Sequence, residues 1–447
     1  MRRTFIVLCL LLLSGLPATA QSKKIEFTEY NLDNGLHVIL HENRAAPIVA
    51  ITVTYHTGSK NEQPNRTGFA HFFEHLMFEG SENIKRGEFF QIVQNAGGEL
   101  NAYTSFDQTV YHEELPSNQA ELGLWLESER MLHLKIDSAG VETQRGVVKE
   151  ERKQRLENKP YGSFMEQTFS HAYKVHPYRW VPIGSAQYID MANLNEFMDF
   201  YKTFYVPNNA VLSISGDFDI PQMKEYVEKY FSEIPKGTRN IFRPDQVEPV
   251  QSAMVKDTVY DNIQLPAVIK AYHIPAQSAP DYYAINMLTT LLSSGQSSRF
   301  YKQIVDNDQK AVQVGSFPFS LENPGLFIAY GISNMGVNAT TVDSAIDAEI
   351  KKVQNNLIDE KEFEKLKNQM ENDFISSKAT NIGVANSLAD YFLFFNGNTN
   401  LINTEIDNYM KVTREDIEYA ASRYLTKENE TILYYLPKSA KTTMKGK

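Results

Sequence analysis

The sequence predicts an α+β protein of two homologous domains, each a mostly antiparallel sheet covered by helices. Three observations support this fold class. The chain has 447 residues, which exceeds the roughly 100–200 residues of a typical domain. Strand-like and helix-like periodicities alternate throughout both halves. A helix–turn–strand pattern at residues 197–212 recurs at residues 417–433, about 219 positions later, which favours an internal duplication.

The first half opens with two strand-like segments, residues 24–32 and 36–42. They flank Asn34-Gly35, a dipeptide that tolerates positive φ and favours a hairpin. Residues 48–55 then alternate between large and small side chains, as a half-buried strand does. Further strands are expected at 99–104, 109–115 and 209–215, and helices at 68–78, 87–96, 118–134, 139–157, 194–204 and 222–234.

A polar stretch without apolar periodicity begins at Pro235 and predicts a linker between two halves. We therefore expect an N-terminal domain at 24–235, a linker at 236–250 and a homologous C-terminal domain at 251–437. In that second domain we expect strands at 266–273 and 325–333, and helices at 281–293, 297–306, 340–356, 359–378 and 412–424. Residues 438–447 are expected to form a loose basic tail.

The first twenty residues have the pattern of a secretory signal peptide. Arg2 and Arg3 precede an apolar run at 5–13, and small residues lead to an expected cleavage after Ala20. The run is shorter than the ~20 residues needed to span a bilayer, and no later segment is apolar enough to span one. We expect an exported protein, periplasmic or secreted, whose mature chain lacks the single cysteine, Cys9. Any metal site must then use His, Asp or Glu.

The charge of the chain bears on its partners. Lys+Arg number 44 and Asp+Glu number 55, which gives a formal net charge of −11. Nucleic-acid binding needs clustered basic side chains, so an acidic chain of this kind argues against a nucleic-acid partner.

A candidate metal site lies in His71-Phe72-Phe73-Glu74-His75. On a helix that advances 100° per residue, the two imidazoles and the carboxylate lie on one face, within about 100° of one another. Two imidazoles one turn apart can bind one Zn²⁺, and Glu74 can take a proton from the metal-bound water. Phe72 and Phe73 fall largely on the other side, where they can pack into a core.

A catalytic zinc ion needs a third protein ligand and an open position. The expected helix at 139–157 offers Glu150 and Glu151. Glu151 shares the inward-looking stripe of Val147 and Val148, whereas Glu150 shares a face with Gly146 and is better placed for solvent. The helix geometry favours Glu151, with Glu150 as the alternative.

These residues resemble the inverzincin metallopeptidases, the family of pitrilysin, insulin-degrading enzyme and the mitochondrial processing peptidase, which carry a His-x-x-Glu-His motif. Glu151 follows His75 by 76 positions, a spacing similar to that of the processing peptidases. Other segments also look like those of the family: 101–104 with Asp107, 145–151, 176–178, 183–184, 205–210 and 297–301.

The resemblance implies a zinc endopeptidase with one Zn²⁺ per chain that cleaves unfolded peptides or small polypeptides in a closed chamber. His71, His75 and Glu151 would hold the metal, and Glu74 would act as general base and then general acid. Asn101 and Ala102 would offer an edge strand to the peptide substrate, because main-chain pairing tolerates many sequences.

Two departures from the family pattern have consequences for the site and for partners. Gln144 stands where members often carry an acidic residue seven positions before the third ligand. Asp308 and Val312 align with the Arg and Tyr by which the second half of many members reaches the substrate. We therefore expect a heterodimer with a homologous, zinc-free subunit that supplies the Arg/Tyr pair, with a homodimer as the second choice. The competing function is that of a non-catalytic structural or peptide-binding homologue.

Overall fold

The computed structural model describes residues 24–445, so the expected signal peptide at 1–20 lies outside the described part. The first domain contains β1 (Thr28–Asn31), β2 (His37–Glu42), β3 (Ile48–Tyr55), α2 (Phe69–Leu76), α3 (Glu88–Asn95), β4 (Glu99–Thr104), β5 (Thr109–Pro116), α4 (Ala120–Leu132), α5 (Ser138–Arg152), α6 (Phe164–Ala172), α7 (Ala186–Met191), α8 (Leu194–Phe204), β6 (Ala210–Gly216) and α9 (Ile220–Phe231).

The second domain contains β7 (Val255–Asp261), β8 (Ala267–His273), α10 (Tyr282–Ser293), β9 (Ala311–Phe319), β10 (Leu326–Ser333), α11 (Ala339–Asn355), α12 (Glu360–Ser376), α13 (Asn381–Phe394), α14 (Leu401–Lys411), α15 (Arg414–Tyr424), β11 (Glu430–Pro437) and α16 (Lys438–Lys445). Two π-helical turns, Lys153–Glu157 and Tyr301–Asn307, lie within segments expected to be α-helical.

The two sheets share one topology, which confirms the expected pair of homologous, mostly antiparallel domains. The first sheet has the order β1-β2-β6-β3-β5-β4 and the second has the order β7-β11-β8-β10-β9. Without β1, the strands occur in the same sequence-relative order in both sheets. The single parallel pairing also recurs, β2 with β6 and β7 with β11, while the other pairings are antiparallel. This correspondence is what an internal duplication produces.

Each sheet packs its own helices against one face. In the first domain α2, α4, α8 and α9 form a core with side chains such as Val38 and Leu212. In the second domain α10, α11 and α15 do the same around Val268 and Phe327. The side chains that alternate with these point to the opposite face of each sheet, and they are apolar too.

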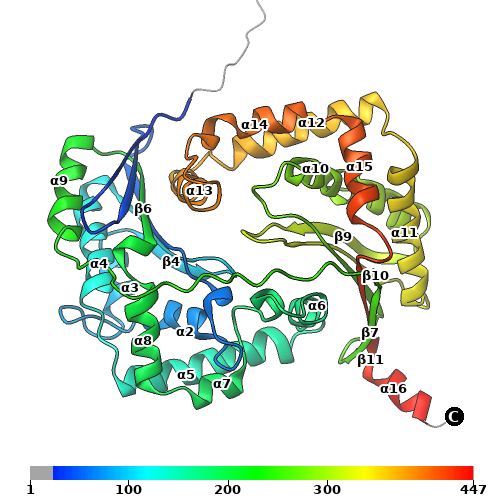
Figure 1. The fold of residues 1–447 in the computed structure, drawn as a ribbon, viewed down its shortest axis with the longest axis horizontal. Helices are drawn as coiled ribbons and strands as arrows, with labels where there is room; N and C mark the ends of the chain where they lie inside the picture. The colour runs from blue at the N-terminus through cyan, green and yellow to red at the C-terminus, as the bar shows by residue number, and fades with distance from the viewer. Residues whose placement is uncertain (1–23, 446–447) are drawn as a thin grey trace, which may run out of the picture.

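The opposite faces are covered by an exchange of helices between the domains. Helix α13 of the second domain packs Val384 and Leu388 against Ile39 and Val211 of the first sheet. Helix α6 of the first domain places Phe169 in one apolar cluster with residues of β8, β10 and β11 in the second sheet. Figure 1 shows α13 beside β6 and α6 below β10. Neither sheet is therefore buried on both faces by its own domain.

A buried ion cluster fastens the two domains where they meet. The Lys60 ammonium, 1% exposed, contacts Asp107 at 2.8 Å within the first domain and also pairs with Glu322 of the second. His56 Nε2 lies 2.6 Å from Glu322 Oε2. The Glu322 backbone N–H donates to Asp107 (2.9 Å), which also accepts from the Tyr178 hydroxyl at 2.6 Å. Buried charges are tolerated when they are paired in this way.

The segment that follows α9 contains neither helix nor strand until β7 begins at Val255, and it crosses between the domains in Figure 1. Its path is anchored by side chains. Arg243 donates to the His56 carbonyl and to Asn209, while Glu248 accepts from three consecutive backbone N–H groups, those of residues 174–176. The segment is thus fixed although it lacks regular structure.

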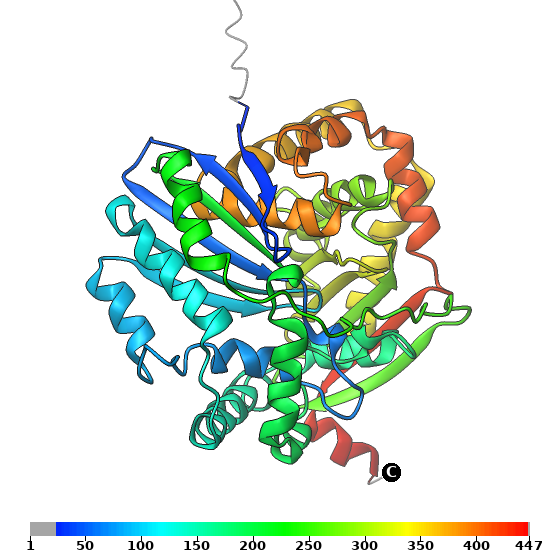
Figure 2. The same ribbon diagram turned by 60° about the vertical axis from the view of Figure 1, so that its left-hand side comes forward.

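The residues expected to form a loose basic tail are helical for most of their length. Residues Lys438–Lys445 form helix α16, which lies at the periphery next to β7 in Figure 1 and Figure 2. It begins directly where β11 ends, so the strand and the helix share one continuous backbone. Among residues 24–445, none of the helices has the length and apolar character needed to traverse a bilayer.

We predict that the contact between the domains weakens in acid through Glu322. Burial acts to raise the pKa of Glu322, but the hydrogen bond with His56 and the charge of Lys60 lower it to about 2. Because this folded pKa lies below the ordinary value of 4.5, the stabilisation is present above about pH 4.5 and disappears as the pH falls towards 2. At pH 7, Glu322→Gln should lower the melting temperature by about 2–5 °C, and the difference should shrink below pH 4.

Differential scanning calorimetry between pH 7 and pH 3 measures this effect. The exposed Glu364→Gln serves as a matched control, since it removes the same charge outside the cluster. A Glu322→Gln difference that stays constant over the whole pH range would contradict the assigned interaction.

Candidate metal centre

Helix α2 is held at its N-terminus by a buried carboxylate. Glu62, 3% exposed, accepts hydrogen bonds from the backbone N–H groups of Gly68 (2.9 Å) and Ala70 (2.8 Å). These are orphan donors of the first helical turn, which a capping acceptor satisfies. Burial raises the pKa of Glu62 to about 8, against the opposing effect of the backbone hydrogen bonds. No pattern in the sequence singled out this residue, because it lies six positions before the cap residue.

The residue before the helix must be glycine. Gly68 has φ +96°, in the left-handed region that favours glycine. A Cβ atom there would lie 2.9 Å from Ile189 Cδ1 and 3.1 Å from the Ile183 carbonyl oxygen. The chain therefore turns tightly into α2 against the loop and helix that precede α8.

The apolar face of α2 sets its rotation. Phe69, Phe72 and Phe73 are buried, and Phe72 stacks on Phe197 of α8 at a centroid distance of 4.5 Å. Phe73 stacks on Phe200 at 5.5 Å. Full burial of one such ring stabilises the fold by about 1.5–3 kcal/mol, so this face is strongly fixed. The residues between the phenylalanines are consequently turned to the other side.

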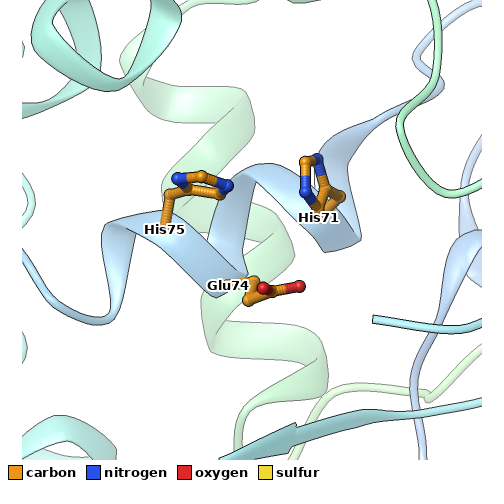
Figure 3. A group of neighbouring side chains, drawn as sticks. All are labelled: His71, Glu74 and His75. Carbon is orange, nitrogen blue, oxygen red and sulfur yellow. The ribbon is translucent and has the colours of Figure 1, made fainter. Parts of the chain in front are cut away.

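That other side carries His71, Glu74 and His75. Each contributes one potential ligand atom, and these atoms lie within 4.8 Å of one another. The two imidazole rings stand edge to face with centroids 4.9 Å apart. Figure 3 shows all three side chains extending from the one helix. The structure thus brings together the motif residues singled out in the sequence.

Glu151 reaches the same place from α5. Its Oε2 lies 3.2 Å from His75 Nε2 and 3.5 Å from His71 Nε2, and its Oε1 pairs with Arg155 at 2.9 Å. Glu150, the alternative, is exposed and accepts a hydrogen bond from Gln154. Glu151 is thus the glutamate that the structure brings to the imidazoles, although Val147, which was expected on the same inward stripe, is 46% exposed. No pattern in the sequence indicated the contact with Arg155. This contact engages one oxygen of Glu151 and leaves the other oxygen facing the histidines.

The electrostatics of these groups suit a cation. Burial, and then the charge of His75, lower the pKa of His71 to about 4, so that its imidazole is neutral near pH 7. Burial would raise the pKa of Glu151, but the contact with His75 and the proximity of His71 and Arg155 outweigh it and lower the pKa. A neutral imidazole and an ionised carboxylate are the protonation states that a divalent metal requires.

The structure offers an independent test of whether these residues fit a metal. Glu151 Oε2 is buried and has no hydrogen-bond partner, because its contacts with the imidazoles lack hydrogen-bond geometry. An unpaired buried carboxylate oxygen costs several kcal/mol unless a partner compensates it. Two imidazole nitrogens and one carboxylate oxygen are a donor set that Zn²⁺ prefers. These three residues therefore fit a zinc ion.

Glu74 has surroundings different from those of Glu151. Its Oε2 accepts a hydrogen bond from Thr104 Oγ1 at 2.7 Å. Burial raises the pKa of Glu74, while the Thr104 hydrogen bond and the charge of His75 oppose the rise. A raised pKa makes this carboxylate a stronger base, which suits a group that takes up a proton and then returns it.

The expected peptide-binding strand lies next to this helix. Asn101 and Ala102 belong to β4, the last strand in the order of the first sheet, where they pair with His112 and Tyr111 of β5. Asn101 is exposed and Ala102 is half-buried. One edge of β4 is thus unpaired within residues 24–445. An edge of this kind can accept an additional strand.

Gln144, Asp308 and Val312, the residues that depart from the family pattern, have the following surroundings in the structure. Gln144 of α5 donates to Glu79 at 2.5 Å, and Glu79 also pairs with Arg86. Asp308 accepts from Gln303 and Lys310 of its own domain, and Val312 is 49% exposed on β9. The hydrogen bonds and the ion pair that the structure gives to the Asp308 side chain are therefore with its own domain.

Comparison with known proteins identifies relatives of both halves. Residues 37–179 match the family described as Insulinase (Peptidase family M16), and residues 192–370 match the Peptidase M16 inactive domain. The "Zinc protease PqqE" of Helicobacter pylori is 33% identical over 388 residues, which cover 86% of this chain and 87% of that protein.

Solved structures of similar fold include proteases. "The crystal structure of a protease from Helicobacter pylori" has a TM-score of 0.89 and 30% identity, and it covers 92% of this chain and 100% of that chain. The periplasmic protease PqqL from Escherichia coli has the same fold, with a TM-score of 0.77 at 18% identity. That alignment covers 95% of this chain but only 49% of PqqL.

We predict that Glu151, and not Glu150, is required for zinc binding. Glu151→Gln removes the ionised oxygen between the imidazoles and should lower zinc affinity by at least about 100-fold. Glu150→Gln removes the same charge one position away and should keep stoichiometric zinc. Metal analysis and competition with a fluorescent chelator measure both affinities. Equal zinc content in the two variants would contradict the assignment.

Proposed function

Because this chain belongs to the M16 (insulinase) family of peptidases, we propose that it is a zinc-dependent endopeptidase that cleaves unfolded peptides or small polypeptides. The observation that carries the proposal is the convergence of His71, His75 and Glu151 beside Glu74. The relatives named as zinc proteases support the same function. One ion per chain is proposed, because this donor set occurs once in residues 24–445.

The chemistry is divided between the ion and the side chains. When bound, the zinc ion supplies Lewis acidity, which lowers the pKa of a water molecule and polarises the scissile carbonyl. Glu74 accepts the proton of the attacking water and then donates it to the leaving amine, as a carboxyl group with a raised pKa can do. His71 remains neutral and holds the metal, with its ring fixed by burial.

We propose that the substrate binds as an additional strand on β4. The unpaired edge offers the backbone groups around Asn101 and Ala102, and the C-terminal end of this strand contacts Glu74 through Thr104. Pairing through backbone groups places an extended peptide beside the general base without reading its sequence. This binding mode excludes folded proteins, whose backbone groups are already paired, and it supports peptides as the substrate class.

The competing function is a non-catalytic structural or peptide-binding homologue. The match to an inactive domain covers residues 192–370, whereas His71, Glu74, His75 and Glu151 all lie before it. A scaffold has no need for a neutral His71 beside an unpaired buried carboxylate oxygen of Glu151. These observations favour the enzyme.

We further propose that the chain is exported and works with a second, zinc-free subunit of the same family. The second domain presents Asp308 and Val312 where an Arg/Tyr pair would serve the substrate. The likeness to about half of PqqL supports an assembly of two such units. A closed chamber between two chains would then complete the site, with a homodimer as the second choice. The signal-like residues 1–20 and the fold shared with PqqL, a periplasmic protease, support a periplasmic location.

We predict that Glu74→Gln keeps zinc and loses hydrolysis. The amide retains the shape of the side chain but cannot accept a proton, so kcat on a quenched fluorescent peptide should fall by about 10²–10⁴-fold. Glu150→Gln is the matched control and should keep its activity. Zinc analysis of the same samples separates loss of chemistry from loss of metal. Equal rates in Glu74→Gln and the wild type would remove the mechanism.

We also predict that the isolated chain is a weak enzyme. Without the Arg/Tyr pair, kcat/KM should rise by about 10-fold or more when the homologous subunit is added. Co-purification from the native host, followed by size-exclusion chromatography with light scattering, measures whether a heterodimer exists. A fully active homodimer of this chain alone would contradict the heterodimer.

A further inference from the structure

Thr104 connects strand β4, where the peptide is proposed to bind, with Glu74, the proposed general base. It is the last residue of β4, the strand proposed to pair with the peptide, and its hydroxyl donates to Glu74 Oε2 at 2.7 Å. Its backbone pairs with Thr109 of β5, so its position is set by the sheet. The position of the hydroxyl is therefore determined by the first sheet, whereas its hydrogen-bond partner Glu74 belongs to helix α2.

The Glu74 carboxylate depends on this contact for its orientation. Within residues 24–445, the Thr104 hydroxyl is the one hydrogen-bond donor that the structure gives to the Glu74 side chain. The bond engages Oε2 and leaves Oε1 available for a proton from water. A half-buried glutamate has three rotatable side-chain bonds, and without a fixed partner several rotamers compete.

We propose that Thr104 is a positioning residue, which holds the Glu74 carboxylate in the rotamer that takes the proton from the nucleophilic water. This inference rests on the proposed function of Glu74. The role belongs to the hydroxyl and not to the methyl group, because the hydroxyl donates the hydrogen bond to the carboxylate. A displacement of a catalytic group by about 1 Å can lower a rate about 100-fold, so a single hydrogen bond is enough to matter.

The arrangement also links peptide binding to the general base. Asn101, Ala102 and Thr104 lie on one strand of six residues, at Glu99–Thr104. A peptide that pairs with the free edge of β4 would fix the strand further, and with it the hydroxyl that holds Glu74. The base and the peptide are then positioned by the same rigid element.

Two substitutions separate the hydroxyl from the shape of the side chain. Thr104→Val replaces the hydroxyl by a methyl group of similar size and preserves a β-branched residue suited to a strand. Thr104→Ser keeps the hydroxyl and removes the methyl group. In Thr104→Val, kcat should fall about 10–100-fold while KM stays within about twofold and zinc content is unchanged. Thr104→Ser should restore kcat to within about threefold of the wild type.

The orientation of Glu74 provides a readout that does not depend on activity. Crystal structures of the zinc-free wild type and both variants should show the carboxylate beside residue 104 in the wild type and in Thr104→Ser. In Thr104→Val the carboxylate should occupy another rotamer or several. An inactive wild type would refute the proposed function, and the rotamers would still decide the role of Thr104.

Three results would overturn the proposal. The first is a Thr104→Val enzyme with kcat within twofold of the wild type. The second is an equal loss in Thr104→Ser and Thr104→Val, which would indicate a role in packing. The third is an unchanged Glu74 rotamer in the valine variant.

Discussion

The structure depends on one constraint: each sheet has two apolar faces, and its own domain covers only one of them. The exchange of α6 and α13 satisfies this constraint for both sheets at once. Burial of apolar area is the dominant favourable contribution to folding, so the two domains are held in one relative position by the same effect that forms each core. The cluster around Lys60 and Glu322 adds directional contacts at the junction, where an apolar surface alone would permit sliding.

The proposed metal centre depends on this fixed framework. The phenylalanines of α2 pack on α8 and determine which face of the helix is free, and Glu62 fixes its first turn. Helix α5 then needs only to bring one carboxylate to two imidazoles. Because Arg155 occupies the other oxygen of Glu151, the carboxylate faces the histidines in one orientation. The proposed ligand set is thus preorganised by contacts that involve no metal.

Local patterns in the sequence were sufficient for much of the fold and for placing the three polar residues of the motif on one helix face. The strands at 48–55 and 325–333 have clear periodicities, and His71, Glu74 and His75 lie on one helix, where spacing translates directly into geometry. Helix α13 was not predicted, because it buries side chains on more than one side and so has no single apolar stripe. Strand β9 contains Gly315 and Pro318, which an edge strand tolerates but which weaken the sequence signal.

The contacts around the motif could not be predicted from spacing. Glu62, Thr104 and Arg155 act through tertiary positions or through a π-helical turn that replaces the expected α-helix. An acidic residue in a polar loop and a threonine at a strand end are common, so neither stands out in a sequence. Their roles become visible only when the partner atoms are in place.

The exchanged helices also determine when the chain can finish folding. Asn381, at the start of α13, donates to the Ile48 carbonyl across 333 positions of sequence, and Asn403 pairs with Ile25 across 378. Contacts this distant close slowly, because the intervening chain must first be ordered. The outer face of the first sheet consequently remains exposed until almost the whole polypeptide is available. A chain that emerges gradually during synthesis would therefore keep this face of the sheet uncovered until residues 381–394 are available.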